Sequence, residues 1–290
     1  ESNEEGKYVG TQNVDDWQTA MNWGRPENNG FRSVWNAGMA ISDNVEAYSF
    51  GNYADTYGEY SFFLRAYDRK DVLGTIPLDP QDPSKGDFSW SETYPLGFTP
   101  RLEGHGNDFS SVFGVKGENL GGYGVNYDFS TSYGSHYIHY YLRNTLNLSW
   151  GPNSPHNFEI GDLQQEETNW NADFTYPMGD INVAFGAEWR EEKYTMYEGQ
   201  KEAWMAGPWG SVHTLAYDSA ATGTLVNYGY SAPGLSANGM QGTSPYEAGV
   251  FKRDNTGFYA DVEYDMDALL VQAAARFEDF SDFGSTSNFK

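Results

Sequence analysis

The stretch 181–190, INVAFGAEWR, has the pattern that decides the fold. Its odd positions are apolar or aromatic, whereas its even positions, from Asn182 to Arg190, are small or polar. Successive side chains of a β-strand point to opposite faces of the sheet, so a period of two predicts a strand with one apolar and one polar face. We therefore expect residues 181–197 to form a long strand whose two faces meet different surroundings.

The same alternation recurs on both sides of this stretch. Apolar residues occupy every second position in 123–133, 168–176, 258–264 and 269–277, and the positions between them hold mainly polar or small side chains. Weaker candidates for strands are 33–41, 45–54 and 109–117. No stretch has a sustained helical period. The sequence predicts an all-β, antiparallel protein.

Composition limits the possible functions. The 290 residues include 41 acidic and 17 basic side chains, which gives a formal net charge of -24. This charge excludes a nucleic-acid partner, because such a partner requires a basic face. Aromatic residues make up 17% of the chain, which is too many for a disordered acidic tail. The absence of cysteine excludes disulfide bonds and thiolate zinc sites.

Short and long connections alternate strictly between the predicted strands. The short ones are 42–44, 118–121, 177–180 and 265–267, and the long ones are roughly 55–108, 134–165 and 198–255. In a bacterial outer-membrane barrel, short periplasmic turns join the strands at one rim and long extracellular loops join them at the other. We therefore predict an antiparallel transmembrane β-barrel in the outer membrane, in contact with lipid and lipopolysaccharide.

The predicted membrane crossings number eight, and a ninth is expected within the first 32 residues. The eight are residues 33–41, 45–54, 109–117, 122–133, 166–176, 181–197, 256–264 and 268–280. Two further strand-like stretches, 59–67 and 137–150, are expected to project above the membrane as hairpins. Counting 137–150 as a crossing would place the long connection 198–255 on the periplasmic side.

A soluble, secreted, carbohydrate-binding β-sandwich is the alternative prediction, because its strands also alternate when one face packs and the other meets water. Sandwiches usually have turn signals every 8 to 12 residues. The long connections of this chain do not fit that spacing.

The sequence shows no catalytic or metal-binding pattern, so we expect neither an enzyme nor a cofactor. His136 and His139 are three residues apart, which places them on opposite faces of a strand. The two side chains of each adjacent pair, Glu166-Glu167 and Glu191-Glu192, likewise point to opposite faces of a strand.

Five pieces of the chain, in order, resemble the TonB-dependent outer-membrane receptors. They are NWGRPE at 22–27, EAYSFGNY at 46–53, GFTPR at 97–101, NVAFGAEWREE at 182–192 and ARFEDFSDFG at 275–284. The resemblance covers nearly the whole chain. It implies a 22-stranded barrel with an N-terminal plug domain, importing a scarce nutrient (siderophore-iron, cobalamin or an oligosaccharide) with energy from the TonB complex.

The chain departs from that pattern in its strand number. Residues 1–290 would supply about 8 to 10 of the 22 strands, without the plug and the remaining strands. We therefore expect a partial barrel that does not transport by itself, because unpaired strand edges are costly in hydrocarbon.

Two sets of residues are candidates for function. Aromatic and histidine side chains of the longest connection can stack on a small-molecule ligand or pack on one another, and they are Trp204, Trp209, His213, Tyr217, Tyr228 and Tyr230. Charged residues on the polar face are expected to line the lumen, where they either contact the plug that the resemblance implies or are simply solvated on the channel wall, and they are Glu188, Arg190, Arg276 and Glu278. The longest connection offers no cationic trap for an anionic chelate, which favours a neutral or carbohydrate ligand.

Overall fold

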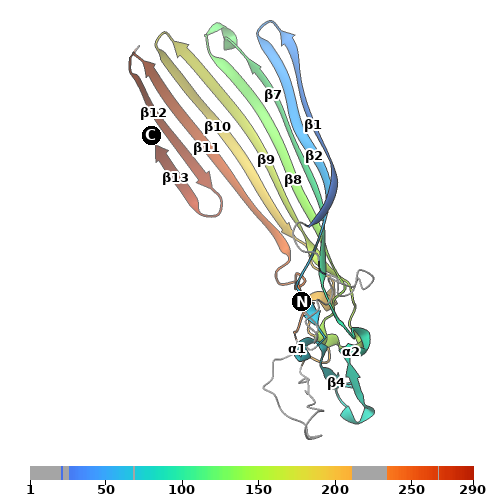
Figure 1. The fold of residues 1–290 in the computed structure, drawn as a ribbon. Coiled ribbons are helices and arrows are strands. Elements are labelled where there is room, and N and C mark those ends of the chain that lie inside the picture. Colours follow the sequence, from blue (N-terminus) through green and yellow to red (C-terminus); the bar gives the residue numbers. More distant parts are fainter. Residues whose placement is uncertain (1–20, 22–25, 68, 211–233, 267) are drawn as a thin grey trace.

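The computed structural model describes residues 21, 26–67, 69–210, 234–266 and 268–290. Most of these residues form one nine-stranded antiparallel sheet whose strands follow chain order (Figure 1). The strands are β1 (Glu27–Ser42), β2 (Val45–Ser61), β7 (Arg101–Gly117), β8 (Asn126–Arg143), β9 (Phe158–Met178), β10 (Ile181–Met196), β11 (Gly249–Asp265), β12 (Leu270–Phe280) and β13 (Gly284–Phe289). The prediction of an all-β, antiparallel protein is confirmed.

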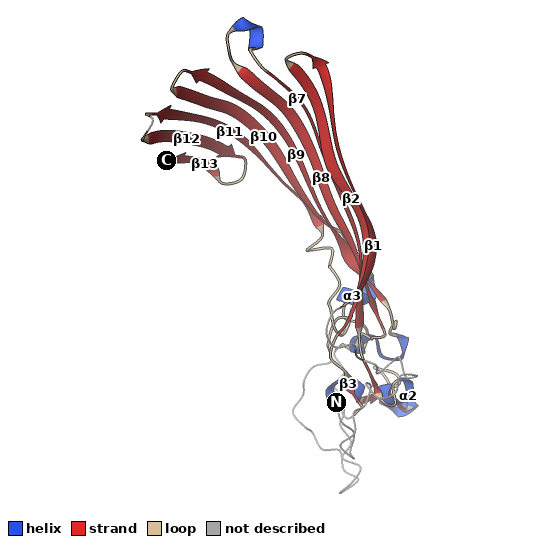
Figure 2. Ribbon diagram, turned by 45° about the horizontal axis from the view of Figure 1, so that its top comes forward, coloured by secondary structure: helices blue, strands red, loops and turns tan. Residues whose placement is uncertain are grey.

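The sheet is a single curved layer with two open edges, β1 and β13 (Figure 2). In the described part of the chain it does not close on itself. The two other sheets there have two strands each, β3 (Arg65–Ala66) with β6 (Gly97–Phe98) and β4 (Thr75–Pro77) with β5 (Asp87–Ser89). Neither is large enough to cover the nine-stranded sheet as the second layer of a sandwich would.

The strand register joins the predicted apolar faces into one surface. Phe185 lies opposite Phe174 on one side and Ala260 on the other, and Phe258 lies opposite Phe277. Directly opposite residues of antiparallel strands point to the same face. The resulting apolar face crosses the sheet and includes Trp35, Tyr53, Phe113, Phe129, Trp170, Phe174, Phe185, Trp189, Phe258 and Phe277.

The large side chains of the apolar face are exposed. Trp170 is 57% exposed, Phe258 53% and Phe185 41%. On the opposite, polar face, the same register aligns hydroxyl, amide and charged side chains, among them Glu46, Lys116, Asp128, Ser130, Asn171, Asp173, Glu188, Asp261, Arg276 and Glu278. The two-faced pattern predicted from the sequence is therefore present, and in the described residues no core covers its apolar side.

Several strands are longer than predicted at the ends where the long connections begin. β2 runs on to Ser61, β7 already begins at Arg101, and β9 begins at Phe158. The stretches 59–67 and 137–150 begin as extensions of strands, because β2 continues to Ser61 and β8 continues to Arg143. The prediction that they form hairpins is wrong. These four strands keep pairing with one another beyond the rest of the sheet, so their backbone groups remain satisfied.

The predicted start of the strand 122–133 is wrong as well. β8 begins only at Asn126, because residues 120–122 form the 3-10 turn η2 (Leu120–Gly122). Gly121, Gly122 and Gly124 have φ of 61°, 85° and 74°, a left-handed backbone that glycine adopts readily. Tyr123 therefore lies in the turn.

The ninth strand of the sheet lies at the other end of the chain from the expected one. Residues 26–32 belong mainly to β1, and residues 1–20 and 22–25 lie outside the described residues. β13 was not predicted, because its residues 285–288 are all polar and show no alternation. Its connection to β12, residues 281–283, is short where the strict alternation required a long one.

The long connections gather beyond one end of the sheet, opposite the short turns (Figure 1). We call their described parts, residues 62–100, 144–157, 197–210 and 234–248, the loop cluster. It contains α1 (Lys70–Leu73), η1 (Pro83–Lys85), α2 (Trp90–Thr93), η3 (Leu148–Asn153), α3 (Lys201–Trp204) and the two small sheets. None of the helices in the described chain is long and apolar enough to cross a membrane.

Candidate functional site

Three of the four charged residues predicted for the lumen come together on the polar face. Arg276 of β12 lies between two carboxylates, with its Nη2 3.0 Å from Glu278 Oε1 and 3.4 Å from Glu188 Oε2 of β10. Glu188 and Glu278 lie opposite Gly257 of β11 from its two sides, and the missing glycine side chain leaves room for the arginine to reach both. The three residues form a charge-paired cluster across three strands.

Arg190, the fourth predicted residue, lies next to this cluster. It is directly opposite Asn255 of β11, which is 1% exposed and donates through Nδ2 to Glu278 Oε1 at 3.2 Å. Within the described chain, Arg190 Nε and Asn255 Oδ1 are buried without a hydrogen-bond partner. A donor and an acceptor on opposite residues can be joined by a water molecule. The polar face thus combines paired charges with unused hydrogen-bonding groups.

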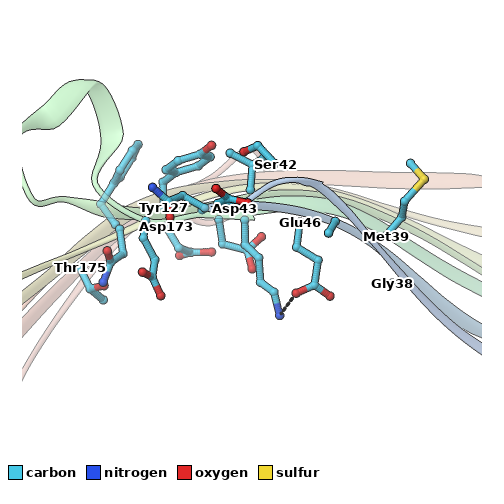
Figure 3. A pocket seen from close by; sticks show the side chains of 17 residues that line it. Gly38, Met39, Ser42, Asp43, Glu46, Tyr127, Asp173 and Thr175 are labelled. Carbon is cyan, nitrogen blue, oxygen red and sulfur yellow. Dashed lines mark ion pairs between the residues drawn. The ribbon is translucent and has the colours of Figure 1, made fainter.

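A hollow lies at the short-turn end of the sheet, where β1, β2, β7, β8 and β9 begin or end (Figure 3). Met39 and Tyr127 extend from one side of the sheet, whereas Glu46 and Asp173 extend from the other. Lys116 Nζ pairs with Glu46 Oε2 at 3.4 Å.

Most of the charge around this hollow is negative. Lys116 is the one basic side chain of its lining, against five acidic ones, Asp43, Glu46, Glu118, Asp128 and Asp173. The phenol of Tyr48 donates to Asp128 Oδ1 at 2.7 Å. Such a rim favours water and cationic groups over anions.

The loop cluster has a hydrophobic core of its own, which the sequence analysis did not predict. One buried group joins the first two long connections and consists of Val72, Leu73, Trp90, Tyr94, Phe98, Leu146 and Leu148. A second group joins strand ends to the third connection and consists of Leu102, Leu142, Phe158, Ile160, Ala203 and Ala237. The long connections are therefore packed together rather than extended separately.

The two described tryptophans of the predicted ligand-binding set help to build this cluster. Trp209 is 5% exposed, and its indole Nε1 donates to the carbonyl of Pro77 at 2.8 Å. Trp204 is half-buried at the end of α3 and donates to the carbonyl of Gly199 at 3.3 Å. Trp209 thus packs connections together, as in the alternative reading of these rings. The remaining members of the set, His213, Tyr217, Tyr228 and Tyr230, lie outside the described residues.

An exposed histidine borders the core of the loop cluster. His156 Nδ1 lies 2.7 Å from the phenol oxygen of Tyr94, and its ring meets Trp90 edge-on at 6.5 Å between centroids. Desolvation by these neighbours lowers the pKa of His156, and burial raises the pKa of Tyr94. Both groups are therefore held in their neutral forms at neutral pH.

Two aromatic residues of the polar face were missed by sequence analysis. Tyr194 of β10 and Phe251 of β11 lie directly opposite each other on that face, at its loop-cluster end. Both are exposed. The available signal was the alternation itself, because Tyr194 stands at an even position of a strand whose even positions from Asn182 to Glu192 are small or polar.

The described residues contain no group of three or more His, Asp or Glu side chains placed to hold a metal ion. His136 and His139, which the sequence placed on opposite faces, pair with different carboxylates, Asp108 and Asp162. The polar and charged side chains described above are suited to reversible hydrogen bonding and charge pairing with a polar solute.

No protein-family model matches this chain, and no curated protein matches it in sequence.

Proposed function

We propose that this chain forms part of the transmembrane β-barrel of an outer-membrane receptor that imports a scarce nutrient. The observation that supports the proposal most is the continuous, exposed apolar face across the sheet, backed by a polar face. A lipid-facing surface and a hydrated lumen call for such a pair of faces. A soluble sheet would instead cover the apolar side, because large exposed apolar patches are rare on soluble monomers.

The height of the apolar face fits a bilayer. On β10 it extends from Ile181 to Trp189, which is eight residue steps. At about 3.3 Å per residue this is about 26 Å along the strand, or about 20 Å along the membrane normal at a tilt of about 40°. The apolar band of outer-membrane barrels is about 25 Å tall.

Charged residues lie at the border of this apolar band that is nearer to the loop cluster. Immediately above Trp189, the apolar face presents two ion pairs, Lys193 with Glu166 at 2.6 Å and Lys252 with Glu191 at 3.5 Å. Charges on the lipid side cost little near the interface but about 2–4 kcal/mol at the midplane. Their position supports the proposal that the loop-cluster end lies outside the hydrocarbon, on the aqueous, extracellular side.

Closure of the barrel requires strands beyond the nine described. β1 and β13 are the two edges and run in the same direction, so they cannot pair antiparallel with each other. An odd number of further strands between them would restore antiparallel pairing on both sides. A 22-stranded receptor barrel leaves thirteen, which satisfies this parity.

The resemblance to TonB-dependent receptors supplies the rest of the proposal. In it, a plug domain fills the lumen, the TonB complex energises uptake, and the charged cluster of Glu188, Arg276 and Glu278 faces the plug. The acidic rim at the short turns lies on the periplasmic side, and the loop cluster forms part of the extracellular entrance.

Fractionation and detergent dependence test this function. We expect the intact protein to sediment with outer membranes, to stay there after a high-salt or alkaline wash, and to need detergent for extraction. A protein that is soluble and monomeric in plain buffer would contradict the proposal and favour the secreted β-sandwich. Ligand uptake that persists after deletion of the TonB protein would contradict the energised mechanism alone.

A further inference from the structure

Two exposed rings lie at the loop-cluster end of the polar face, far from the stacked rings of Tyr48 and Phe50 near its short-turn end. Tyr194 is 38% exposed and Phe251 is 55% exposed, and they lie directly opposite each other on neighbouring strands. Opposite residues on one face have Cβ atoms about 4.5–5.5 Å apart, so the two side chains leave the sheet next to each other. Together they present an apolar platform at the loop-cluster end of the polar face.

A free amide borders this platform. Gln165 of β9 lies directly opposite Tyr194 on the other side from Phe251. Its side chain is exposed and has no hydrogen-bond partner in the described part of the chain. A primary amide offers two donors and a carbonyl acceptor, which together can engage neighbouring hydroxyl groups.

Further amide and hydroxyl groups lie two same-face positions farther along β9. Asn169 of β9 donates to Ser132 Oγ of β8 at 3.0 Å and to Glu167 Oε1 at 2.7 Å. These bonds fix the orientation of hydrogen-bonding groups four residues from Gln165, towards the short-turn end of the same face.

The charges around the platform do not favour an anionic ligand. Arg253 pairs with Glu192, and His136 pairs with Asp108 at 2.5 Å. Glu167 has no cationic partner in the described residues, which leaves the surroundings negative. Arg190, further along β10, lies beside the carboxylate of Glu278. A neutral ligand with many hydroxyl groups suits this environment better than a phosphate, a carboxylate or an anionic chelate.

We propose that Tyr194, Phe251 and Gln165 form a subsite for a pyranose ring of a neutral saccharide. The C–H face of the sugar stacks on the two rings, and the amide of Gln165 binds adjacent hydroxyl groups at its edge. The inference deepens the proposed function, because it requires that the polar face lines the lumen and that the loop-cluster end is its entrance.

The test is calorimetric titration of the intact, detergent-purified protein with maltohexaose, xylohexaose and chitohexaose. Hexagalacturonate serves as the anionic counterpart. We expect at least one neutral hexasaccharide to bind and hexagalacturonate to bind less tightly. Tyr194→Ala and Phe251→Ala should each weaken that binding about tenfold, which corresponds to about 1.4 kcal/mol. Gln165→Ala should weaken it about threefold or more.

Two controls separate stacking from damage to the sheet. Phe251→Leu keeps an apolar side chain but removes the flat ring, and it should lose as much affinity as Phe251→Ala. Val250→Ala changes an exposed residue of the same strand on the opposite face, and it should leave binding unchanged. Each variant is compared by its unfolding temperature in detergent.

The inference is overturned if none of the three neutral probes binds, if the ring variants bind as well as the parent, or if hexagalacturonate binds more tightly. These failures leave the proposed function standing when the protein still fractionates with the outer membrane. A soluble, monomeric protein would instead remove the proposed function, whatever the titration shows.

Discussion

At the scale of single residues, adjacent positions of one strand are assigned to opposite environments. Phe185 lies at the middle of the apolar stretch of β10, and its neighbour Ala184 points to the polar face, directly opposite Asp261. Phe185→Arg should lower the free energy of unfolding by about 2–4 kcal/mol, because it places a charge at the bilayer midplane. Ala184→Arg should have little effect, because it meets water and a carboxylate.

The measurement is denaturant unfolding of the intact protein reconstituted in lipid vesicles. The pair is matched in strand, depth and introduced side chain, so only the face differs. Equal destabilisation by the two variants would contradict the assignment of the faces.

A second prediction at this scale concerns pH. Burial lowers the pKa of His156, so the folded loop cluster binds its proton less readily than the unfolded chain does. Stability from this group is therefore complete above the ordinary pKa of about 6.5 and is lost as the pH falls below it towards the lowered value. The effect should be small, because His156 is exposed and water screens its charge.

Hydrogen exchange of residues 144–157 tests this prediction, because the Thr145 amide bonds to the carbonyl of His156 at 3.0 Å. After correction for intrinsic rates, protection should fall between pH 7.5 and pH 5. His156→Gln should reduce this fall. A variant with the full pH dependence of the parent would show that another group is responsible.

At the scale of strands, two glycines that both lie within strands differ in the space around them, and substitution to alanine should therefore affect them differently. A Cβ added at Gly51 of β2 would overlap the carbonyl of Ser110 and the indole of Trp35, whereas one added at Gly134 of β8 would meet nothing within 4 Å. Gly51→Ala should therefore cost about 1–3 kcal/mol by overpacking. Gly134→Ala should be neutral or slightly stabilising, because it restricts the unfolded chain.

Unfolding titrations of the two variants decide this point. A neutral Gly51→Ala would mean that Trp35 does not pack over β2 as the structure shows.

The loop cluster has its own prediction. Trp209→Ala removes a buried indole and its bond to Pro77, and such truncations cost about 3–5 kcal/mol. Hydrogen exchange in residues 75–98 and 144–157 should accelerate, whereas Trp204→Ala should change it much less. If ligand affinity fell in Trp209→Ala without any change in exchange, a binding role would replace the packing role.

The sequence predicted the strands in which apolar and polar side chains alternate. It did not predict the elements that depend on pairing with a neighbouring strand or on the backbone conformation of glycine. Phe185, Trp189 and Phe258 fall into register because each strand separates apolar from polar side chains. The polar strand β13 has no such signal, since it is held by pairing with β12 alone. The start of β8 depends on the left-handed backbone of Gly124 and its neighbours, which alternation does not encode.

The sequence likewise predicted the charged cluster of the candidate site but not the packing of the loop cluster. Glu188, Arg276 and Glu278 share the polar face because of their positions in the alternation, and the structure brings them together. The packing of the loop cluster joins residues far apart in sequence, such as Trp90 and Leu146, without a periodic pattern. No local rule places Trp209 inside that core.

At the scale of the whole molecule, the central claim is that the apolar face meets lipid and the polar face lines a hydrated lumen. The chain contains no cysteine, so single-cysteine variants can be labelled without background. Nitroxide labels placed one at a time along β10, from residue 181 to residue 189, can report both environments in vesicles containing the intact protein. Oxygen, which concentrates in hydrocarbon, and a neutral nickel chelate, which stays in water, are the two relaxing agents.

The account predicts that accessibility alternates with a period of two. Labels at odd positions, including 183, 185 and 187, should be relaxed mainly by oxygen, and labels at even positions, including 184 and 186, mainly by the nickel chelate where the lumen is open. Odd positions shielded from both agents would place their side chains in a protein core and contradict the claim. Odd positions relaxed mainly by the nickel chelate would place them in water and contradict it equally.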